Sequence, residues 1–302
     1  MNANHKNYNL RAILWMLFHM FTAALICASY RILGAEMDRA VVAFYLNVIG
    51  FIFLIPFALW KRKELAQSTL WRIYMLRALL TASSQILLVY AYNNMEFAQV
   101  SAITLLYPLM CSAASCMIFR EKVGIRRASA LVTGFIGAVI IINPSYHAFN
   151  HYSLYVILVT FLWVAYDLAT SKWGKTESLI TQSFFVMLFV TLFSALPASF
   201  KDFTNVSPLF WENFHYFGLI VVFYFVSGIA AIMHANELSV VMPFYFLVLV
   251  VSTAIGYYVF SESVSLSTSF GATIILGSTS YIAYREYQIK KSMEKQKSTR
   301  LI

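Results

Sequence analysis

Ten long apolar runs, separated by short polar segments, leave this 302-residue chain few ways to fold. A helix needs about 20 mostly apolar residues to cross the hydrocarbon core of a bilayer, where the backbone must satisfy its own hydrogen bonds. A membrane β-barrel would instead show segments of about ten residues with alternating polarity. The sequence therefore predicts an all-α membrane protein whose ten transmembrane helices span residues 12–33, 41–60, 72–92, 97–118, 126–143, 152–171, 179–199, 214–235, 239–260 and 267–285.

The composition excludes an ordinary soluble domain, because 60% of the residues are hydrophobic and only 12% are charged. A soluble domain carries about 25% charged residues. The three cysteines, Cys27, Cys111 and Cys116, all lie in apolar runs and show neither a disulfide framework nor metal-ligand spacing. We therefore expect no metal site and no cofactor. Because no small-residue cleavage site follows the first run, we expect it to remain as the first helix.

Most of the 22 lysines and arginines lie in segments that face one side if ten helices cross the membrane. These segments are residues 6–11, 61–72, 120–127, 172–175 and 285–300. Basic residues gather on the cytoplasmic side of membrane proteins. The distribution thus predicts cytoplasmic termini and a basic cytoplasmic tail over 286–302. The net charge of +9 forms no stripe or motif typical of nucleic-acid binding, so we expect no nucleic-acid partner.

Several residues recur at a constant separation of 141 positions, which indicates an internal repeat. The repeat predicts two domains, 12–143 and 152–285, each of five helices. An odd number of helices inverts the second copy, which is the architecture of many secondary transporters that bind substrate between their halves. The matching pairs are Pro56 and Pro197, Glu96 and Glu237, Phe119 and Phe260, and Glu121 and Glu262.

Short motifs along the chain resemble the drug/metabolite transporter superfamily, EamA type. They are Leu76-Arg77-Ala78, Tyr107-Pro108-Leu109, Phe119-Arg120-Glu121 and Gly134-Phe135-Ile136-Gly137. Within that superfamily the chain is similar to the S-adenosylmethionine uptake transporters of intracellular bacteria, through Val42-Ala43-Phe44-Tyr45, Tyr166-Asp167, Glu177-Ser178 and Met242-Pro243. The resemblance implies a bacterial inner-membrane protein that imports S-adenosylmethionine or a related amino-acid derivative. Amino acids fit the same features, so the substrate, direction and coupling ion stay open.

Charged groups inside a span cost about 2.5–3.5 kcal/mol on insertion scales, so they are candidates for function. Asp167 is the only acidic residue well inside a predicted helix, and it lies one turn from Trp163. The carboxylate either binds an ammonium or sulfonium group, couples proton movement, or stays near the interface and bridges towards Lys172. We take Asp167 and Trp163 as candidate substrate-binding residues.

The third predicted helix carries a polar stripe that includes Arg77, Thr81, Ser84 and Gln85. Such a stripe on an apolar helix should face a cavity. Arg77 either binds a substrate carboxylate or extends to the membrane surface, as long basic side chains do. Gln85 lies nearer the midplane and is the simpler candidate.

Aromatic and small residues supply the remaining candidates. Tyr107 and Tyr245 can stack on a planar group such as adenine. His19 either titrates and couples proton movement or packs in the interior. Small residues on the fifth predicted helix allow close packing within the chain or between the protomers of a homodimer, and they are Ala130, Gly134 and Ala138.

These features favour a transporter of a small metabolite that works by alternating access in the lipid bilayer. An exporter of amino acids or drugs from the same superfamily is the alternative. A membrane-embedded enzyme is less favoured, because the sequence has no His-Glu-x-x-His pair and no Gly-x-Ser-x-Gly motif. A channel would require a continuous polar pore, which the apolar runs do not suggest.

Overall fold

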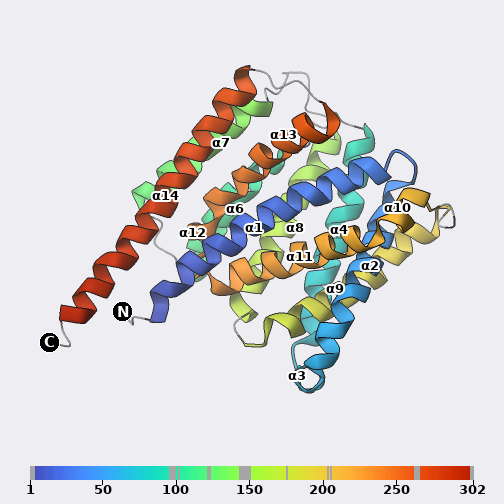
Figure 1. Cartoon of the computed structure of the whole chain (residues 1–302), viewed down its shortest axis with the longest axis horizontal. Coiled ribbons are helices and arrows are strands. Elements are labelled where there is room, and N and C mark those ends of the chain that lie inside the picture. Colours follow the sequence, from blue (N-terminus) through green and yellow to red (C-terminus); the bar gives the residue numbers. More distant parts are fainter. Residues whose placement is uncertain are drawn as a thin grey trace.

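A computed structural model describes residues 4–94, 100, 103–120, 124–142, 151–174, 176–202, 204, 206–261 and 266–299. Within these residues every regular element is a helix, and the long helices lie side by side (Figure 1). The helices are α1 (Asn4–Leu33), α2 (Arg39–Trp60), α3 (Arg62–Ala66), α4 (Trp71–Asn94), α6 (Leu106–Phe119), α7 (Ile125–Ile142), α8 (His151–Trp173), α9 (Leu179–Ser199), α10 (Pro208–Glu212), α11 (Phe214–His234), α12 (Leu238–Val241), η1 (Met242–Phe246), α13 (Leu247–Phe260) and α14 (Leu266–Thr299).

Six stretches of the described residues are long and apolar enough to cross a membrane. They are Asn9–Leu33, Arg39–Trp60, Tyr152–Trp173, Leu179–Ser199, Phe214–His234 and Leu238–Phe260. The all-α prediction is confirmed for the described residues, whereas the count of ten spans stays a prediction. Three residues of the repeat pattern, Glu96, Glu121 and Glu262, lie outside the described residues.

The predicted span 239–260 matches the apolar helical stretch Leu238–Phe260, which is not a uniform α-helix. The chain there forms α12, then the 3₁₀ helix η1, then α13. Pro243 causes the change, because proline lacks an N–H and its ring clashes with the carbonyl of the preceding turn. Four residues of η1 are buried, so the irregular backbone lies inside the protein, as lipid requires.

Helix α14 continues beyond 285, the predicted end of the last span, to Thr299. The segment expected to be a basic tail is therefore helical as far as the structure describes it. Lysine and arginine are good helix formers, and a charged helix can project beyond the bilayer into water.

Contacts between loops place several of them at the same end of the molecule as the start of α1. Glu177 accepts a hydrogen bond of 2.7 Å from the Ser68 hydroxyl, and Arg127 forms an ion pair with Glu237. The N–H of Asn236 donates to the side chain of Asn9 over 3.3 Å. We call this the basic end, defined by residues 9, 61–70, 127, 176–178 and 236–237. Figure 1 shows both termini and α3 in the lower half of the view.

A second set of contacts defines the opposite end, at residues 31–38, 201–207 and 260. The Lys201 ammonium lies 3.4 Å from the Asp38 carboxylate, and the Ser207 hydroxyl donates to Glu36. The Arg31 guanidinium lies 4.4 Å from the centre of the Phe260 ring. Arg127 and the basic segment 61–72 thus share one end, as alternating spans require.

Helix pairing follows the pattern that an inverted repeat would produce. α1 packs on α11 and α4 packs on α8, while α2 pairs with α9 and α7 with α14. Arg120 and Ser261 both have left-handed backbone, with φ of 54° and 53°, and each follows the phenylalanine that ends its helix. These positions are 141 residues apart. The pattern agrees with the repeat, which remains an inference from the sequence.

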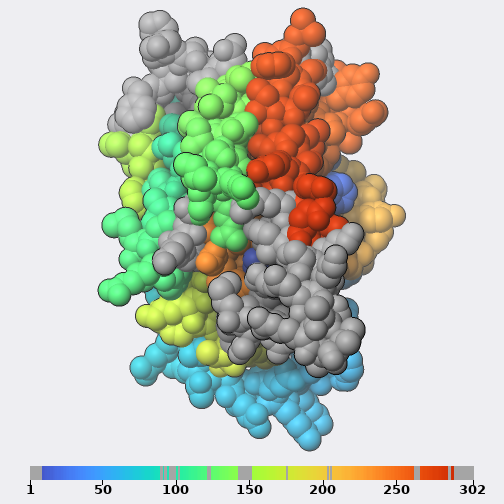
Figure 2. All heavy atoms as spheres, turned by 90° about the vertical axis from the view of Figure 1, so that its left-hand side faces the viewer, coloured from blue at the N-terminus to red at the C-terminus, as the bar shows by residue number. Residues whose placement is uncertain are grey.

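Helices α7 and α14 approach closely because glycines lie in their contact. A methyl group added at Gly137 would lie 2.9 Å from the carbonyl oxygen of Gly271, and one added at Gly271 would meet the carbonyl of Gly137. Figure 2 shows these two helices side by side on one face. The small face predicted for 126–143 is used within the chain, since Ala130 and Ala138 are buried and Gly134 faces the Phe246 ring.

Replacing Gly271→Ala is expected to lower the free energy of unfolding by about 1–3 kcal/mol, because the added methyl overlaps backbone that cannot rotate away. Gly277→Ala on the same helix is the matched control, since nothing lies within 4 Å of its added carbon. Thermal unfolding of both purified variants in detergent measures the difference. Equal melting temperatures would contradict this packing.

Candidate functional site

A cavity of about 100 Å³ lies among the helices, between residues from both predicted halves. Helices α1, α4 and α6 contribute from the first half, and α8, α11 and η1 from the second. Its lining residues are Met16, His19, Thr81, Tyr107, Trp163, Tyr166, Asp167, Tyr224, Phe225, Gly228, Ile229, Ile232 and Tyr245. Five of the seven residues proposed from the sequence therefore meet at one cavity.

Asp167 is the acidic group of this cavity and is only 6% exposed. Its carboxylate accepts a hydrogen bond from the Tyr107 hydroxyl, which joins α8 to α6. The contact replaces the bridge to Lys172 considered from the sequence, because the Lys172 ammonium instead lies 4.7 Å from the Trp173 ring centre. Asp167 thus presents a buried carboxylate to the cavity.

Aromatic rings surround this carboxylate. The Tyr107 ring centre lies 4.8 Å from that of Tyr245 and 5.7 Å from that of Trp163. The indole N–H of Trp163 donates to the Ser84 hydroxyl over 3.2 Å, which fixes the ring against α4. The arrangement combines a negative charge with π faces, and both attract organic cations.

His19 forms the opposite wall, and α11 holds its ring in place. Its Nδ1 lies 3.0 Å from the backbone carbonyl oxygen of Tyr224 and 3.4 Å from the Ser227 hydroxyl. Gly228 permits this approach, because an added carbon there would lie 2.8 Å from the imidazole Cε1. The histidine is therefore packed against α11 and also lines the cavity, while its coupling of proton movement stays a prediction.

Arg77 lies behind the cavity wall and does not line it. The side chain is 1% exposed, so it does not extend to the membrane surface. Its Nη1 donates to Gln182 over 3.0 Å and its Nη2 donates to the Tyr166 hydroxyl over 3.2 Å. Arg77 therefore reaches the cavity only through Tyr166, whose ring centre lies 4.8 Å from the guanidinium carbon.

Gln85 is half-buried and also lies outside the cavity lining. Its side-chain oxygen is buried and has no hydrogen-bond partner among the described residues. A buried carbonyl without a donor costs about 1–3 kcal/mol. The polar stripe on α4 is thus divided, with Thr81 in the cavity wall and its other members beside it.

Several cavity residues were not singled out from the sequence as binding residues. They are Met16, Thr81, Tyr166, Tyr224, Phe225, Gly228, Ile229 and Ile232. The sequence offered a reason to select Tyr166, since this residue adjoins Asp167 in one of the motifs that carry the resemblance. The sequence offered none for Tyr224, because the chain contains 19 tyrosines and its helix is apolar on every side.

The comparisons with known proteins define the class of protein. Residues 10–143 match the EamA-like transporter family. A crystal structure of another protein superposes with a TM-score of 0.73 at 15% identity, covering 94% of this chain and 98% of that one, which supports the fold alone. The chain is therefore a multi-pass membrane protein whose residues 10–143 are similar to this family, which confirms the resemblance drawn from its motifs.

Several relatives of this chain have named functions. The "S-adenosylmethionine uptake transporter" of Rickettsia prowazekii is 26% identical over 298 residues, covering 97% of this chain and 98% of the relative. The "Riboflavin transporter" of Vibrio cholerae is 30% identical over 199 residues, covering 64% of this chain and 66% of the relative. The matched family and the names of these relatives indicate a transporter.

Replacing Gly228→Ala is expected to raise the KM of transport about tenfold, or about 1.4 kcal/mol, while the protein still folds. The added methyl would push the His19 ring away from its position on α11 and into the cavity. Uptake into liposomes against substrate concentration measures the effect, with the exposed Gly277→Ala as the control. An unchanged KM would remove the His19 ring from the binding site.

Proposed function

We propose that this protein is a secondary transporter that moves a small metabolite across the bacterial inner membrane by alternating access. The cavity around Asp167 is the proposed substrate site, between the five-helix domains 12–143 and 152–285. S-adenosylmethionine or a related amino-acid derivative is the proposed substrate. The observation that carries the proposal is a buried carboxylate enclosed by aromatic rings in the middle of an EamA-type fold.

The charge of Asp167 favours a cationic substrate. Among the residues that the structure describes, no basic group lies within ion-pair distance of this carboxylate. A carboxylate buried without a cation is costly, and a sulfonium or ammonium group of the substrate would offset that cost. The Tyr107, Tyr245 and Trp163 rings suit an adenine ring or a cation, by stacking or by cation–π attraction.

The size of the cavity supports a conformational change during transport. Sites for small-molecule ligands measure about 300–1,000 Å³, whereas this cavity holds about 100 Å³. A metabolite the size of S-adenosylmethionine therefore fits only after the walls move apart. The described state corresponds to a closed carrier, which is one of the states that alternating access requires.

A planar, uncharged metabolite such as riboflavin is the second candidate. Two relatives carry the name riboflavin transporter, and the rings that line the cavity would stack on a flavin. Export of amino acids or drugs, weighed from the sequence, remains the alternative for direction. We further propose that the basic end faces the cytoplasm with both termini, because basic loops stay on that side.

The proposed substrate can be tested by thermal shift followed by counterflow. S-adenosylmethionine, riboflavin and amino acids are each added to the purified protein, because a bound ligand raises the melting temperature. Liposomes preloaded with the stabilising compound should then show saturable uptake of the labelled compound. Stabilisation by riboflavin but not S-adenosylmethionine would select the second candidate, and non-saturating flux of every solute would indicate a channel.

Asp167→Asn is expected to lower S-adenosylmethionine uptake at least about 100-fold, because the amide keeps the shape of the side chain and removes the charge that binds the cation. Initial uptake rates and thermal unfolding should be measured together, since the fold should survive. Asp202→Asn, in the exposed loop beside Thr204, is the matched control and should transport normally. Unchanged uptake by Asp167→Asn would exclude the carboxylate from binding.

A further inference from the structure

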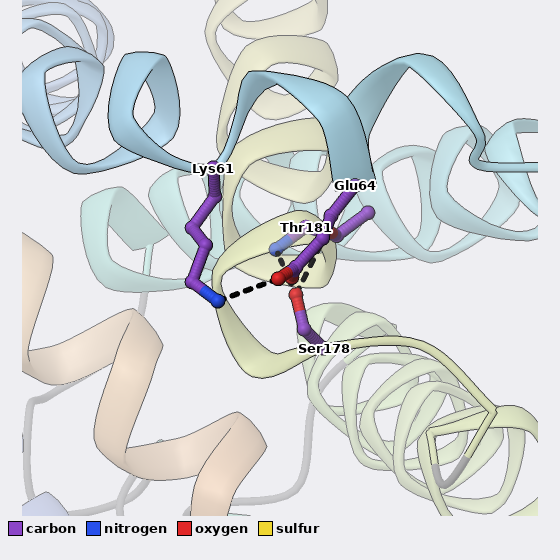
Figure 3. A network of polar contacts seen from close by, with 4 residues as sticks. All are labelled: Lys61, Glu64, Ser178 and Thr181. Atoms are coloured by element: carbon purple, nitrogen blue, oxygen red, sulfur yellow. Dashed lines mark hydrogen bonds and ion pairs between the residues drawn. The ribbon is translucent and has the colours of Figure 1, made fainter.

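Two segments, one from each predicted half, are joined by hydrogen bonds at the basic end. Residues 61–77 of the α2–α4 region meet Gly174 and residues 176–182 between α8 and α9. We define these two segments as the latch. Figure 3 shows part of it, where Lys61 and Glu64 lie against Ser178 and Thr181.

Glu177 holds the outer part of the latch. Its carboxylate accepts hydrogen bonds from the Ser68 hydroxyl at 2.7 Å and the Tyr74 hydroxyl at 2.8 Å. The backbone N–H groups of Thr69 and Leu70 donate to the same carboxylate over 3.1 and 3.3 Å. Hydrogen bonds to a charged acceptor are roughly twice as strong as neutral ones. Four donors from one half thus converge on one side chain of the other.

Gln182 and Arg77 form the inner part of the latch. Gln182 is fully buried, and its amide nitrogen donates to the carbonyl oxygens of Gly174 at 2.6 Å and Glu177 at 3.1 Å. Its amide oxygen accepts from Arg77, which in turn donates to the Tyr166 hydroxyl. A continuous chain of hydrogen bonds therefore runs from the Glu177 loop to the cavity wall.

Glu64 adds a third contact at the surface. Lys61 donates to its carboxylate over 2.5 Å. This hydrogen bond, together with one from the Ser178 hydroxyl, holds the pKa of the Glu64 carboxyl below its usual value. Glu64 therefore stays ionised beside the N-terminus of α9, where the helix dipole favours negative charge.

We propose that the latch is the gate that closes the substrate cavity towards the basic end, and that Glu177 is its main positioning residue. The side chains of Tyr74, Arg77 and Gln182 are buried, and Arg77 links Gln182 by hydrogen bonds to Tyr166 in the cavity wall. Opening this end must separate the two segments and break the bonds to Glu177. The inference rests on the proposed transport function only in taking the cavity as the substrate site.

The repeat supplies an equivalent contact at the opposite end. Glu36 lies 141 residues before Glu177, and it accepts a hydrogen bond from Ser207 in the α9–α10 connection. Each acidic residue thus joins the loop after the first helix of its half to the loop after the second helix of the other half. Two gates at opposite ends are what alternating access needs.

Accessibility of a cysteine in the cavity tests the gate without any substrate. Thr81→Cys is introduced after Cys27, Cys111 and Cys116 have been replaced by alanine, because Thr81 lines the cavity. Vesicles with the basic end outward are identified by labelling of Lys63→Cys and protection of Lys201→Cys. A membrane-impermeant maleimide is then added outside, and the labelling rate at position 81 is measured.

Glu177→Gln should raise that labelling rate about tenfold, because weakening the bonds to the carboxylate shifts the population towards the open state. Tyr74→Phe should raise the labelling rate less, since this substitution removes only one of the donors to Glu177. Tyr74→Phe serves as the test variant if Glu177→Gln does not fold. The matched control is Glu36→Gln at the opposite end, which should leave this rate within about twofold of the parent.

Equal labelling rates at position 81 in the parent and in Glu177→Gln would overturn the proposed gate. A rise in Glu36→Gln as large as that in Glu177→Gln would also overturn it. The result is separable from the substrate assignment. Raised labelling in a protein that does not bind S-adenosylmethionine would support the gate and reject only the substrate. Unchanged labelling in a protein that takes up S-adenosylmethionine would reject only the gate.

Discussion

The burial of two charged side chains, Arg77 and Asp167, is the constraint on which the arrangement of the helices depends. Both side chains are buried, and within the described residues neither has a direct ion pair. Each is held by neutral groups, Arg77 by Gln182 and Tyr166, and Asp167 by Tyr107. Since an unsatisfied charge in a low-dielectric interior is costly, these bonds fix α4, α6, α8 and α9 relative to one another.

The apolar runs were sufficient to predict helices, but they left two features of these helices undetermined. Hydrophobicity alone does not register the effect of Pro243, near which the start of a run forms a 3₁₀ helix. It also cannot locate the end of α14, because a basic segment can stay helical in water. The number of membrane spans remains a prediction, since six stretches among the described residues are long and apolar enough to cross a membrane.

The candidate site was predicted in part. Because burying polar groups is costly, such residues can be identified in the sequence, but the residues that they contact cannot. Asp167, Trp163, Tyr107, Tyr245 and His19 do line one cavity. Helical spacing puts Arg77 and Thr81 on one face of α4, yet of these two only Thr81 lines the cavity. Arg77, one turn earlier, instead contacts Gln182 of α9. The rotation of each helix is set by tertiary packing, which one sequence does not reveal.

An inverted repeat can supply a symmetric scaffold with asymmetric chemistry, and two equivalent positions illustrate this. Arg77 corresponds by the 141-residue spacing to Gly218, where an added carbon would lie 2.7 Å from the Phe53 ring. Of these two positions, the one near the basic end therefore holds a buried arginine with polar partners. The one near the opposite end holds a glycine in close contact with an aromatic ring.

The two proposed gates differ in the same way. Four donors converge on Glu177, whereas among the described residues Ser207 is the side-chain donor to Glu36. A carrier with unequal gates rests mainly with the stronger one closed. If the basic end faces the cytoplasm, the empty carrier would open more readily to the outside. That resting state suits uptake, because the substrate is then captured from the outside before the inner gate opens.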